Sequence, residues 1–251
     1  MVKNIKTRLD ALMVEKGLVP SRERARAMIM AGNVRVNDVR VDKAGIKFFP
    51  HATVVLKEKD IPYVSRGGLK LERALDVLSL DLSGLTCLDI GASTGGFTDC
   101  MLQNGAAKVY AVDVGYGQMA WSLRQDDRVI VIERTNIRYI DFEIIGELMD
   151  LITIDTSFIS LKLVVPAAEQ FMKPGTLILA LIKPQFEAGK ERIGKGGVVR
   201  DPVLRMEIVG EIVSFFIHRG YETLPVIESP VPGPKGNVEF ILPMTKLSLH
   251  H

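Results

Sequence analysis

The fold is decided by the stretch Thr86-Cys87-Leu88-Asp89-Ile90-Gly91-Ala92-Ser93-Thr94-Gly95-Gly96-Phe97-Thr98. An apolar run ends in an acid, opens into small residues and leads into a helical pattern, which predicts a strand, a glycine-rich turn and a helix. Glycine lets the backbone approach a ligand closely, and the free N–H groups of a helix start favour an electron-rich partner. A second apolar strand, Lys108 to Val112, ends in Asp113, 113 − 89 = 24 residues after Asp89. An acid at that distance can hold a ribose through its hydroxyls.

The spacing of this turn differs from that of a dinucleotide site, which needs three glycines over six residues. Here an acid precedes the first glycine, where it would repel a pyrophosphate but suit a cationic ligand such as the sulfonium and amino group of S-adenosylmethionine. The alternative is a structural turn without a ligand, and the spacing of Asp113 favours the ligand. We expect the cofactor to be bound by Asp89, Gly91, Ser93, Thr94, Gly95, Gly96, Phe97, Asp113, Val114, Asn136 and Asp155.

Length and composition limit the architecture. A chain of 251 residues suits one large domain or two modest ones. The polar start, Met1 to Asp10, does not read as a signal peptide, and the longest aliphatic run, Leu177 to Ile182, is far shorter than the ~20 residues that cross a bilayer. Two cysteines, Cys87 and Cys100, form neither a disulfide framework nor a zinc set. We therefore expect a cytoplasmic protein with no membrane and no metal partner.

Charge is unevenly distributed along the chain. Residues 1–60 carry 13 Lys and Arg against 7 Asp and Glu, a net of +6, whereas the remaining 191 residues carry 19 against 23, a net of −4. This asymmetry indicates an anionic partner for the basic end, most simply a nucleic acid.

The basic end reads as a small α+β module. We expect helices from Arg8 to Lys16 and from Arg22 to Ala31, a hairpin from Val34 to Val41 around Asn37-Asp38, and a strand from Thr53 to Leu56. The module resembles the S4 RNA-binding domain in Arg8-Leu9-Asp10, Ser21-Arg22-x-x-Ala25 and Ile29-x-x-Gly32-x-Val34-x-Val36-Asn37. The resemblance implies contact with RNA shape and phosphate. The alternative is a solvated charged face. The expected RNA-binding residues are Arg8, Arg22, Arg24, Arg26, Arg35, Arg40 and Arg66.

The rest of the chain alternates strands and helices, which predicts a parallel sheet covered on both faces, with the last two strands as a hairpin at one edge. That order matches the α/β fold of class I methyltransferases. We expect an S4-like domain at residues 1–58, a linker at 59–64, a methyltransferase domain at 65–246 and a tail at 247–251 that includes a candidate tag remnant. Further expected elements are helices 69–78, 115–124 with Trp121 inward, 161–172 and 203–219, and strands 129–133, 150–154, 175–182, 222–227 and 237–242.

Ligands of such sheets bind beyond the carboxyl ends of the strands. Asp155 and Lys183 each follow a strand there, Lys70 begins the helix before the first strand, and Glu239 lies in the edge hairpin. A buried, unpaired Lys183 would be costly, so one interpretation is a purely structural ion pair between Lys183 and Asp155.

A second resemblance gives these residues a role. Lys70, Asp155, Lys183 and Glu239 match the Lys-Asp-Lys-Glu tetrad of FtsJ-like ribose 2′-O-methyltransferases. With the S4-like module, the whole chain resembles the TlyA family of rRNA methyltransferases, historically called hemolysins. The resemblance implies methylation of ribose, with cytidine as the target, and ribosomal RNA or ribosomal subunits as partner. Further matching motifs are Ser65-Arg66-Gly67-Gly68-x-Lys70-Leu71, Ser157-Phe158-Ile159-Ser160, Lys183-Pro184-Gln185-Phe186 and Gly197-Val198-Val199-Arg200-Asp201.

The chemistry of the tetrad follows from its charges. A ribose hydroxyl must lose its proton as it attacks a methyl group, and a neutral Lys183 could accept that proton. Lys70, as a second cation, favours the neutral amine, whereas Asp155 and Glu239 orient the amine and oppose that effect. The sequence leaves this balance open.

Other classes of function fit less well. An amino-methyltransferase would need prolines in Asp155-Thr156-Ser157-Phe158, and a cytosine-C5 enzyme would need a cysteine there. A membrane-lysing hemolysin would need a spanning or strongly amphipathic segment. A non-catalytic ribosome-assembly factor stays open, as do the target nucleotide, the ribosomal RNA and the oligomeric state.

Overall fold

The structure is a computed structural model that describes residues 5–19, 21–30, 32–56, 61–194 and 196–247. The chain divides into two compact units, Met1–Pro62 and Tyr63–His251. Several expected features lie wholly or partly outside the described residues: the polar start, the end of the second helix at Ala31, most of the linker, and the tail.

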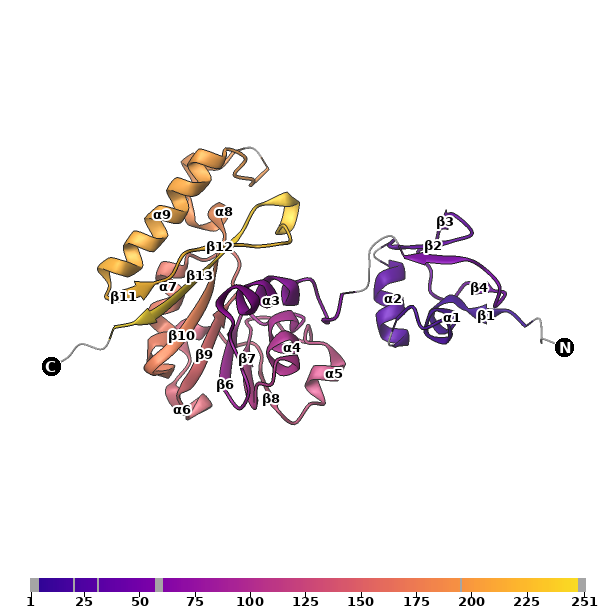
Figure 1. Cartoon of the computed structure of the whole chain (residues 1–251), viewed down its shortest axis with the longest axis horizontal. Helices are drawn as coiled ribbons and strands as arrows, with labels where there is room; N and C mark the ends of the chain where they lie inside the picture. The colour runs from indigo at the N-terminus through magenta and orange to yellow at the C-terminus, as the bar shows by residue number, and fades with distance from the viewer. Residues whose placement is uncertain (1–4, 20, 31, 57–60, 195, 248–251) are drawn as a thin grey trace. The chain divides into compact units, whose positions relative to one another are not determined.

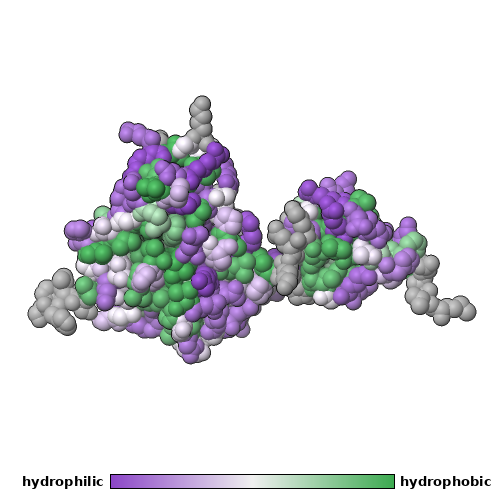
Figure 2. All heavy atoms as spheres, turned by 45° about the horizontal axis from the view of Figure 1, so that its top comes forward, coloured by the Kyte–Doolittle hydropathy of each residue, from purple (hydrophilic) through white to green (hydrophobic). Residues whose placement is uncertain are grey.

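The N-terminal unit packs two helices against short strands. Asn37 and Asp38 both have positive φ, 48° and 65°, as a tight two-residue hairpin turn requires. The unit has its own core, which includes Leu9, Met13 and Ile29. Figure 2 shows that its visible face is divided, with hydrophilic residues at the top and hydrophobic residues below. Its elements are β1 (Thr7–Arg8), α1 (Leu9–Glu15), α2 (Arg22–Met30), β2 (Val34–Val36), β3 (Val39–Arg40), β4 (Lys47–Phe48) and β5 (Val54–Leu56); β1 pairs with β4, and the order β3-β2-β5 forms a second sheet.

The C-terminal unit is built on one eight-stranded sheet, ordered β11-β13-β10-β9-β6-β7-β8, with β12 paired to β13. The strands from β10 to β8 along this path are parallel, and β13 runs antiparallel to β10, β11 and β12. The antiparallel hairpin expected at one edge is therefore confirmed. The strands are β6 (Thr86–Ile90), β7 (Lys108–Val112), β8 (Val129–Ile132), β9 (Met149–Ile154), β10 (Met172–Ile182), β11 (Tyr221–Thr223), β12 (Ile227–Glu228) and β13 (Phe240–Lys246).

Helices cover both faces of this sheet (Figure 1). Successive strand residues point to opposite faces, so Ile152 joins a core with α7 and α9, whereas its neighbour Leu151 joins a core with α3 and α4. The fold is thus the predicted class I methyltransferase fold. The helices are α3 (Gly67–Leu78), α4 (Gly96–Gln103), α5 (Trp121–Arg124), α6 (Phe142–Ile145), α7 (Leu161–Ala168), α8 (Pro184–Glu187) and α9 (Pro202–His218).

One expected helix is wrong. Only the last turn of the segment 115–124 is helical, and Trp121 is 61% exposed instead of facing inward. Gly117 has a φ of +71°, and the Asp113 carboxylate accepts a hydrogen bond from the backbone N–H of Gly115. These contacts turn the chain before α5, so the 3.6-residue periodicity does not extend across the segment.

Other helices and strands begin or end at residues different from those expected, each because of a local contact or residue. The helix expected to reach Met172 ends at Ala168, because Met172 already pairs with Met149 in the sheet. The strand expected from 222 to 227 is split into β11 and β12, and Pro225, which has no N–H to donate, lies between them. The last strand begins at Phe240, three residues later than expected, because the Asn237 side chain is bonded to the 197–199 loop.

Candidate active site

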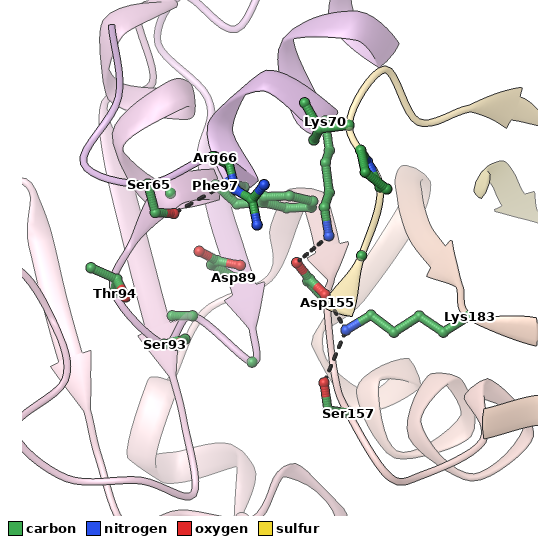
Figure 3. Close-up of a pocket in the computed structure, with 17 residues that line it drawn as sticks. Ser65, Arg66, Lys70, Asp89, Ser93, Thr94, Phe97, Asp155, Ser157 and Lys183 are labelled. Atoms are coloured by element: carbon green, nitrogen blue, oxygen red, sulfur yellow. Dashed lines mark hydrogen bonds and ion pairs between the residues drawn. The ribbon is translucent and has the colours of Figure 1, made fainter. Parts of the chain in front are cut away.

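The sheet order brings the strand tips together. Strands β10, β9 and β6 are neighbours, so Lys183, Asp155 and Asp89 meet at the carboxyl edge of the sheet. They line a cavity of about 390 Å³ together with Lys70 from the first turn of α3. Figure 3 shows the two lysines reaching Asp155 from different sides.

The four tetrad residues form a row of alternating charge. Lys183 Nζ lies 2.5 Å from Asp155 Oδ1, and Lys70 Nζ lies 3.6 Å from Asp155 Oδ2 and 2.7 Å from Glu239 Oε2. The Glu239 side chain is fully buried and those of Lys70 and Lys183 are 10% and 6% exposed. The structure therefore brings together all four residues expected from the sequence. Each charged side chain of the row lies beside one of opposite charge, which offsets the cost of burying it away from water.

Close backbone packing holds the row in place. Gly233 lies so near Glu239 that a Cβ there would fall 1.9 Å from Oε1 of the carboxylate, and a Cβ on Gly68 would fall 2.2 Å from the Tyr63 ring. Because these two glycines lack a Cβ, the edge hairpin and helix α3 can pack closely enough for Glu239 and Lys70 to make contact. Lys183 is the residue just before α8, and Pro184 begins that helix.

Two polar neighbours received no role from the sequence. Lys183 Nζ donates a hydrogen bond to Ser157 Oγ at 3.1 Å, and Gln185 Nε2 lies 3.5 Å from Glu239 Oε1. Both residues belong to motifs noted above. Each lies two residues past a charged strand tip, and this position was the available signal.

Asp89 is buried beneath the glycine turn. Its carboxylate accepts hydrogen bonds from Thr98 Oγ1 at 2.6 Å and Thr153 Oγ1 at 3.1 Å. Burial raises the pKa of Asp89 to about 7; the charge of Asp155 adds to this rise and the two threonines oppose it. A positive ligand group beside Asp89 would favour its ionised form.

The glycine turn itself is tight. Gly91 has a φ of +85°, and a Cβ there would fall 2.7 Å from the Asp155 carbonyl oxygen. Gly95, the N-cap residue of α4, has a φ of +96° and faces the Leu123 and Met119 side chains. Gly91 therefore lies at the cavity, whereas Gly95 serves packing beneath it. Three more of the expected cofactor-binding residues, Thr94, Gly96 and Phe97, line the first cavity.

A second cavity, of about 470 Å³, adjoins the turn. Asp113 accepts hydrogen bonds from the backbone N–H of Ser93 at 2.8 Å and of Gly115 at 2.6 Å, so its carboxylate ties the turn to the next strand. Asn136 uses its side-chain oxygen to accept from the Arg138 N–H. Phe158, 89% exposed with a φ of +64°, also lines this cavity; the sequence placed it in a motif but gave it no role of its own. Expected cofactor residues on this wall are Gly91, Ser93, Asp113, Val114, Asn136 and Asp155.

The structure places the expected RNA-binding arginines in four settings. Arg66 lines the first cavity. Arg35 and Arg40 are directly paired across β2 and β3, and the Arg40 guanidinium covers Gly32. Arg24 lies on α2, where its backbone N–H bonds to the Ser21 hydroxyl. The remaining three, Arg8, Arg22 and Arg26, converge on Asp10.

Metal-ligand clusters and membrane-spanning helices are both absent from the described part of the chain. It contains no group of three or more His, Cys, Asp or Glu residues placed to hold a metal ion. Within the same residues, none of the helices combines the length and the hydropathy of a membrane span. Burial raises the pKa of both cysteine thiols, Cys87 and Cys100, to about 12, so neither is a ready nucleophile.

Two family models match the chain. Residues 63–246 match the FtsJ-like methyltransferase family, and residues 7–48 match the S4 domain. The chain is 46% identical to the 16S/23S rRNA (cytidine-2′-O)-methyltransferase TlyA of Mycobacterium tuberculosis, over 94% of this chain and 89% of that protein. The chain belongs to the TlyA family. The predicted resemblance is thereby confirmed.

Other TlyA-like proteins agree along nearly the whole length. YqxC of Bacillus subtilis, named as a candidate rRNA methyltransferase, is 49% identical over 94% of this chain and 85% of that protein. A solved structure from Streptococcus thermophilus, named as a candidate hemolysin, is 44% identical with a TM-score of 0.76, over 98% of this chain and 90% of that chain. The TlyA-family arrangement of an S4 domain before an FtsJ-like methyltransferase domain is therefore present here.

Proposed function

We propose that this TlyA-family enzyme transfers a methyl group from S-adenosylmethionine to a ribose 2′-hydroxyl of ribosomal RNA, with cytidine as the target nucleotide. The main support is the buried row Lys183–Asp155–Lys70–Glu239 beside the Asp89–Gly91 turn. The substrate class comes from relatives, one of which is named as a 16S/23S rRNA (cytidine-2′-O)-methyltransferase. An enzyme with that substrate would work in the cytoplasm on ribosomal subunits.

The residues of the two cavities fit the cofactor. Gly91 lines both cavities in a turn packed too closely against the Asp155 carbonyl for a Cβ, and Asp89 offers a buried carboxyl to a cationic group. Asp113 offers a carboxylate to ribose hydroxyls, and Asn136 lies on the same wall for the base. When bound, S-adenosylmethionine supplies a methyl group that a sulfonium makes electrophilic.

The protein's own part of the reaction is to remove a proton. Lys183 is at one end of the row and lines the first cavity, so in its neutral form it would accept the proton of the 2′-hydroxyl as the oxygen attacks. Asp155 fixes the direction of Nζ from 2.5 Å, and Ser157 accepts a second bond. These two contacts fix both N–H bonds of the neutral Lys183 amine, and its lone pair then points in the one remaining direction.

The Asp155 carboxylate lies between Lys183 and the other half of the row. Lys70 lies 3.6 Å from the same carboxylate and is itself bound to the buried Glu239. Asp155 therefore shares its charge between two lysines, and after Lys183 loses a proton Lys70 still lies 3.6 Å from Asp155 and 2.7 Å from Glu239.

The RNA contacts proposed for residues 1–58 are separate from this chemistry. That part carries the S4 domain match and six of the seven expected arginines; Arg66 is on the cavity side. We assign residues 1–58 to RNA binding, 59–64 to a linker and 65–246 to methyl transfer.

Transfer of a labelled methyl group to bacterial 30S and 50S subunits tests the proposal. Wild-type protein should label RNA, and Lys183→Ala should not, although it still binds cofactor by calorimetry. Labelling that stays absent with wild-type protein on both subunits, despite measured cofactor binding, would favour the non-catalytic assembly factor.

A further inference from the structure

Asp10 is a buried acid that the proposed reaction does not use. It lies in the first turn of α1 with no exposed surface. Arg8 donates to both of its oxygens, at 3.0 and 3.3 Å, and Arg22 and Arg26 donate to Oδ2 at 2.9 and 3.0 Å. The Ala11 backbone N–H donates to Oδ1 at 3.0 Å. One carboxylate therefore gathers three guanidinium groups from β1 and α2.

This carboxylate stays ionised. Burial alone would raise the pKa of Asp10, but the hydrogen bonds from the three arginines outweigh it and hold the pKa well below the ordinary range. The cluster thus carries three positive charges and one negative charge, a net of +2.

The arginines remain open to solvent although their partner is not. Their side chains are 44%, 51% and 53% exposed, in the order Arg8, Arg22 and Arg26. A guanidinium has five N–H donors, and the bonds to Asp10 occupy only one or two of them in each arginine. Each group therefore keeps donors that Asp10 does not use, beside two neighbours of the same charge.

We propose that Asp10 is a positioning residue, whose buried carboxylate presets this arginine cluster to bind the phosphate backbone of RNA. An isolated surface arginine loses side-chain freedom when it binds, and that loss weakens affinity. Three arginines already fixed by one acid have lost it in the free protein. The fork of a guanidinium also matches two phosphate oxygens at once. This inference rests on the proposed RNA-binding role of residues 1–58.

A preset cluster and long-range charge alone predict opposite changes in RNA affinity when Asp10 loses its charge. Asp10→Asn removes a negative charge from an RNA-binding face, so long-range charge alone predicts tighter binding. If Asp10 presets the arginines, the same change frees them and binding weakens. Asp38→Asn is the matched control: Asp38 is an exposed acid of the same module, in a hairpin turn with positive φ that asparagine also tolerates.

The experiment measures full-chain affinity for 30S and 50S subunits across a range of salt concentrations. Asp10→Asn should weaken binding at least about fivefold and reduce the slope of log affinity against log salt by about one, as one lost phosphate contact would. Asp38→Asn should bind as tightly as wild type or slightly tighter. Equal or tighter binding by Asp10→Asn, with the module folded by amide hydrogen exchange, would overturn the proposal.

If Asp10→Asn unfolds the module, arginine variants test the preset cluster instead. Arg22→Ala and Arg26→Ala should each weaken binding more than Arg35→Ala, because Arg35 is an exposed arginine outside the cluster. Equal losses at the three positions would refute a preset cluster. No loss at any of them would instead contradict the RNA-binding role itself, so the two failures are distinguishable.

Discussion

Replacement of Lys183 tests the general-base assignment most sharply. In the folded protein the amine contacts Asp155 at 2.5 Å and Ser157 at 3.1 Å, and it is 6% exposed. Loss of a general base lowers a rate by ~10²–10⁴, equal to ~3–5 kcal/mol of barrier at 1.36 kcal/mol per tenfold change. Lys183→Ala should therefore lower kcat by at least about a hundredfold.

The effect on stability should be smaller than the effect on rate. Breaking a buried ion pair costs ~3–5 kcal/mol when the remaining charge is left unpaired. Here Lys70 still lies 3.6 Å from Asp155, so we expect Lys183→Ala to cost about 1–3 kcal/mol of folding free energy. Affinity for S-adenosylmethionine and for RNA should be nearly unchanged, because the missing interaction acts mainly in the transition state.

Lys183→Arg separates a base from a positioning charge. Arginine keeps the positive charge beside Asp155 but does not give up its proton at working pH. It should restore the melting temperature towards wild type while kcat stays as low as in Lys183→Ala. Ser157→Ala is the control, because it removes one contact of Lys183 and leaves the amine. Steady-state transfer of labelled methyl with saturating cofactor and subunits measures kcat. An active Lys183→Arg enzyme would refute the base assignment and leave Lys183 as a structural or positioning ion.

Three further changes test other parts of the account. Asp113→Ala should weaken S-adenosylmethionine binding at least about tenfold in calorimetry, since it removes a charged hydrogen-bond partner; equal affinity would take Asp113 out of the site. The folded state holds the Asp89 proton more tightly than the unfolded chain does, because its pKa rises from 3.8 to about 7. Stability of the cofactor-free protein should therefore fall as pH rises from about 4 to about 7, and thermal melts of Asp89→Asn should lose that component; an unchanged pH profile would contradict it. Deletion of residues 1–58 should weaken RNA binding and flatten its salt dependence while cofactor affinity survives, and undiminished RNA binding by residues 61–246 would give the S4 domain another task.

Much of the site could be predicted because parallel strands place their tips at one edge. Asp155 and Lys183 each follow a buried strand, so the sequence alone indicated that they meet. The contact between Lys70 and Glu239 spans 169 positions in the chain, and no local pattern encodes it; only the family resemblance suggested it. Periodicity failed at Trp121, because α5 is a single turn with that residue at its first position.

Other contacts were hidden because residue types do not reveal their partners. Asp113 was expected to face a ribose, yet both of its oxygens already accept backbone N–H groups. A carboxylate has about four lone-pair sites, so each oxygen of Asp113 keeps one for a ribose hydroxyl. Likewise, the sequence showed the positive charge of the arginines in the N-terminal unit. It gave no sign that Asp10, a residue of the Arg8-Leu9-Asp10 motif, would bind three of them.

The central claim is that the methyl group goes to a ribose oxygen. Cleavage of RNA by alkali requires a free 2′-hydroxyl, so a 2′-O-methylated nucleotide protects the phosphodiester on its 3′ side. Subunits treated with the protein and labelled cofactor should yield the label in an alkali-resistant dinucleotide, and mass spectrometry of its nuclease products should identify 2′-O-methylcytidine. Label recovered only in single nucleotides after alkali, as a base-methylated product would give, would contradict the account.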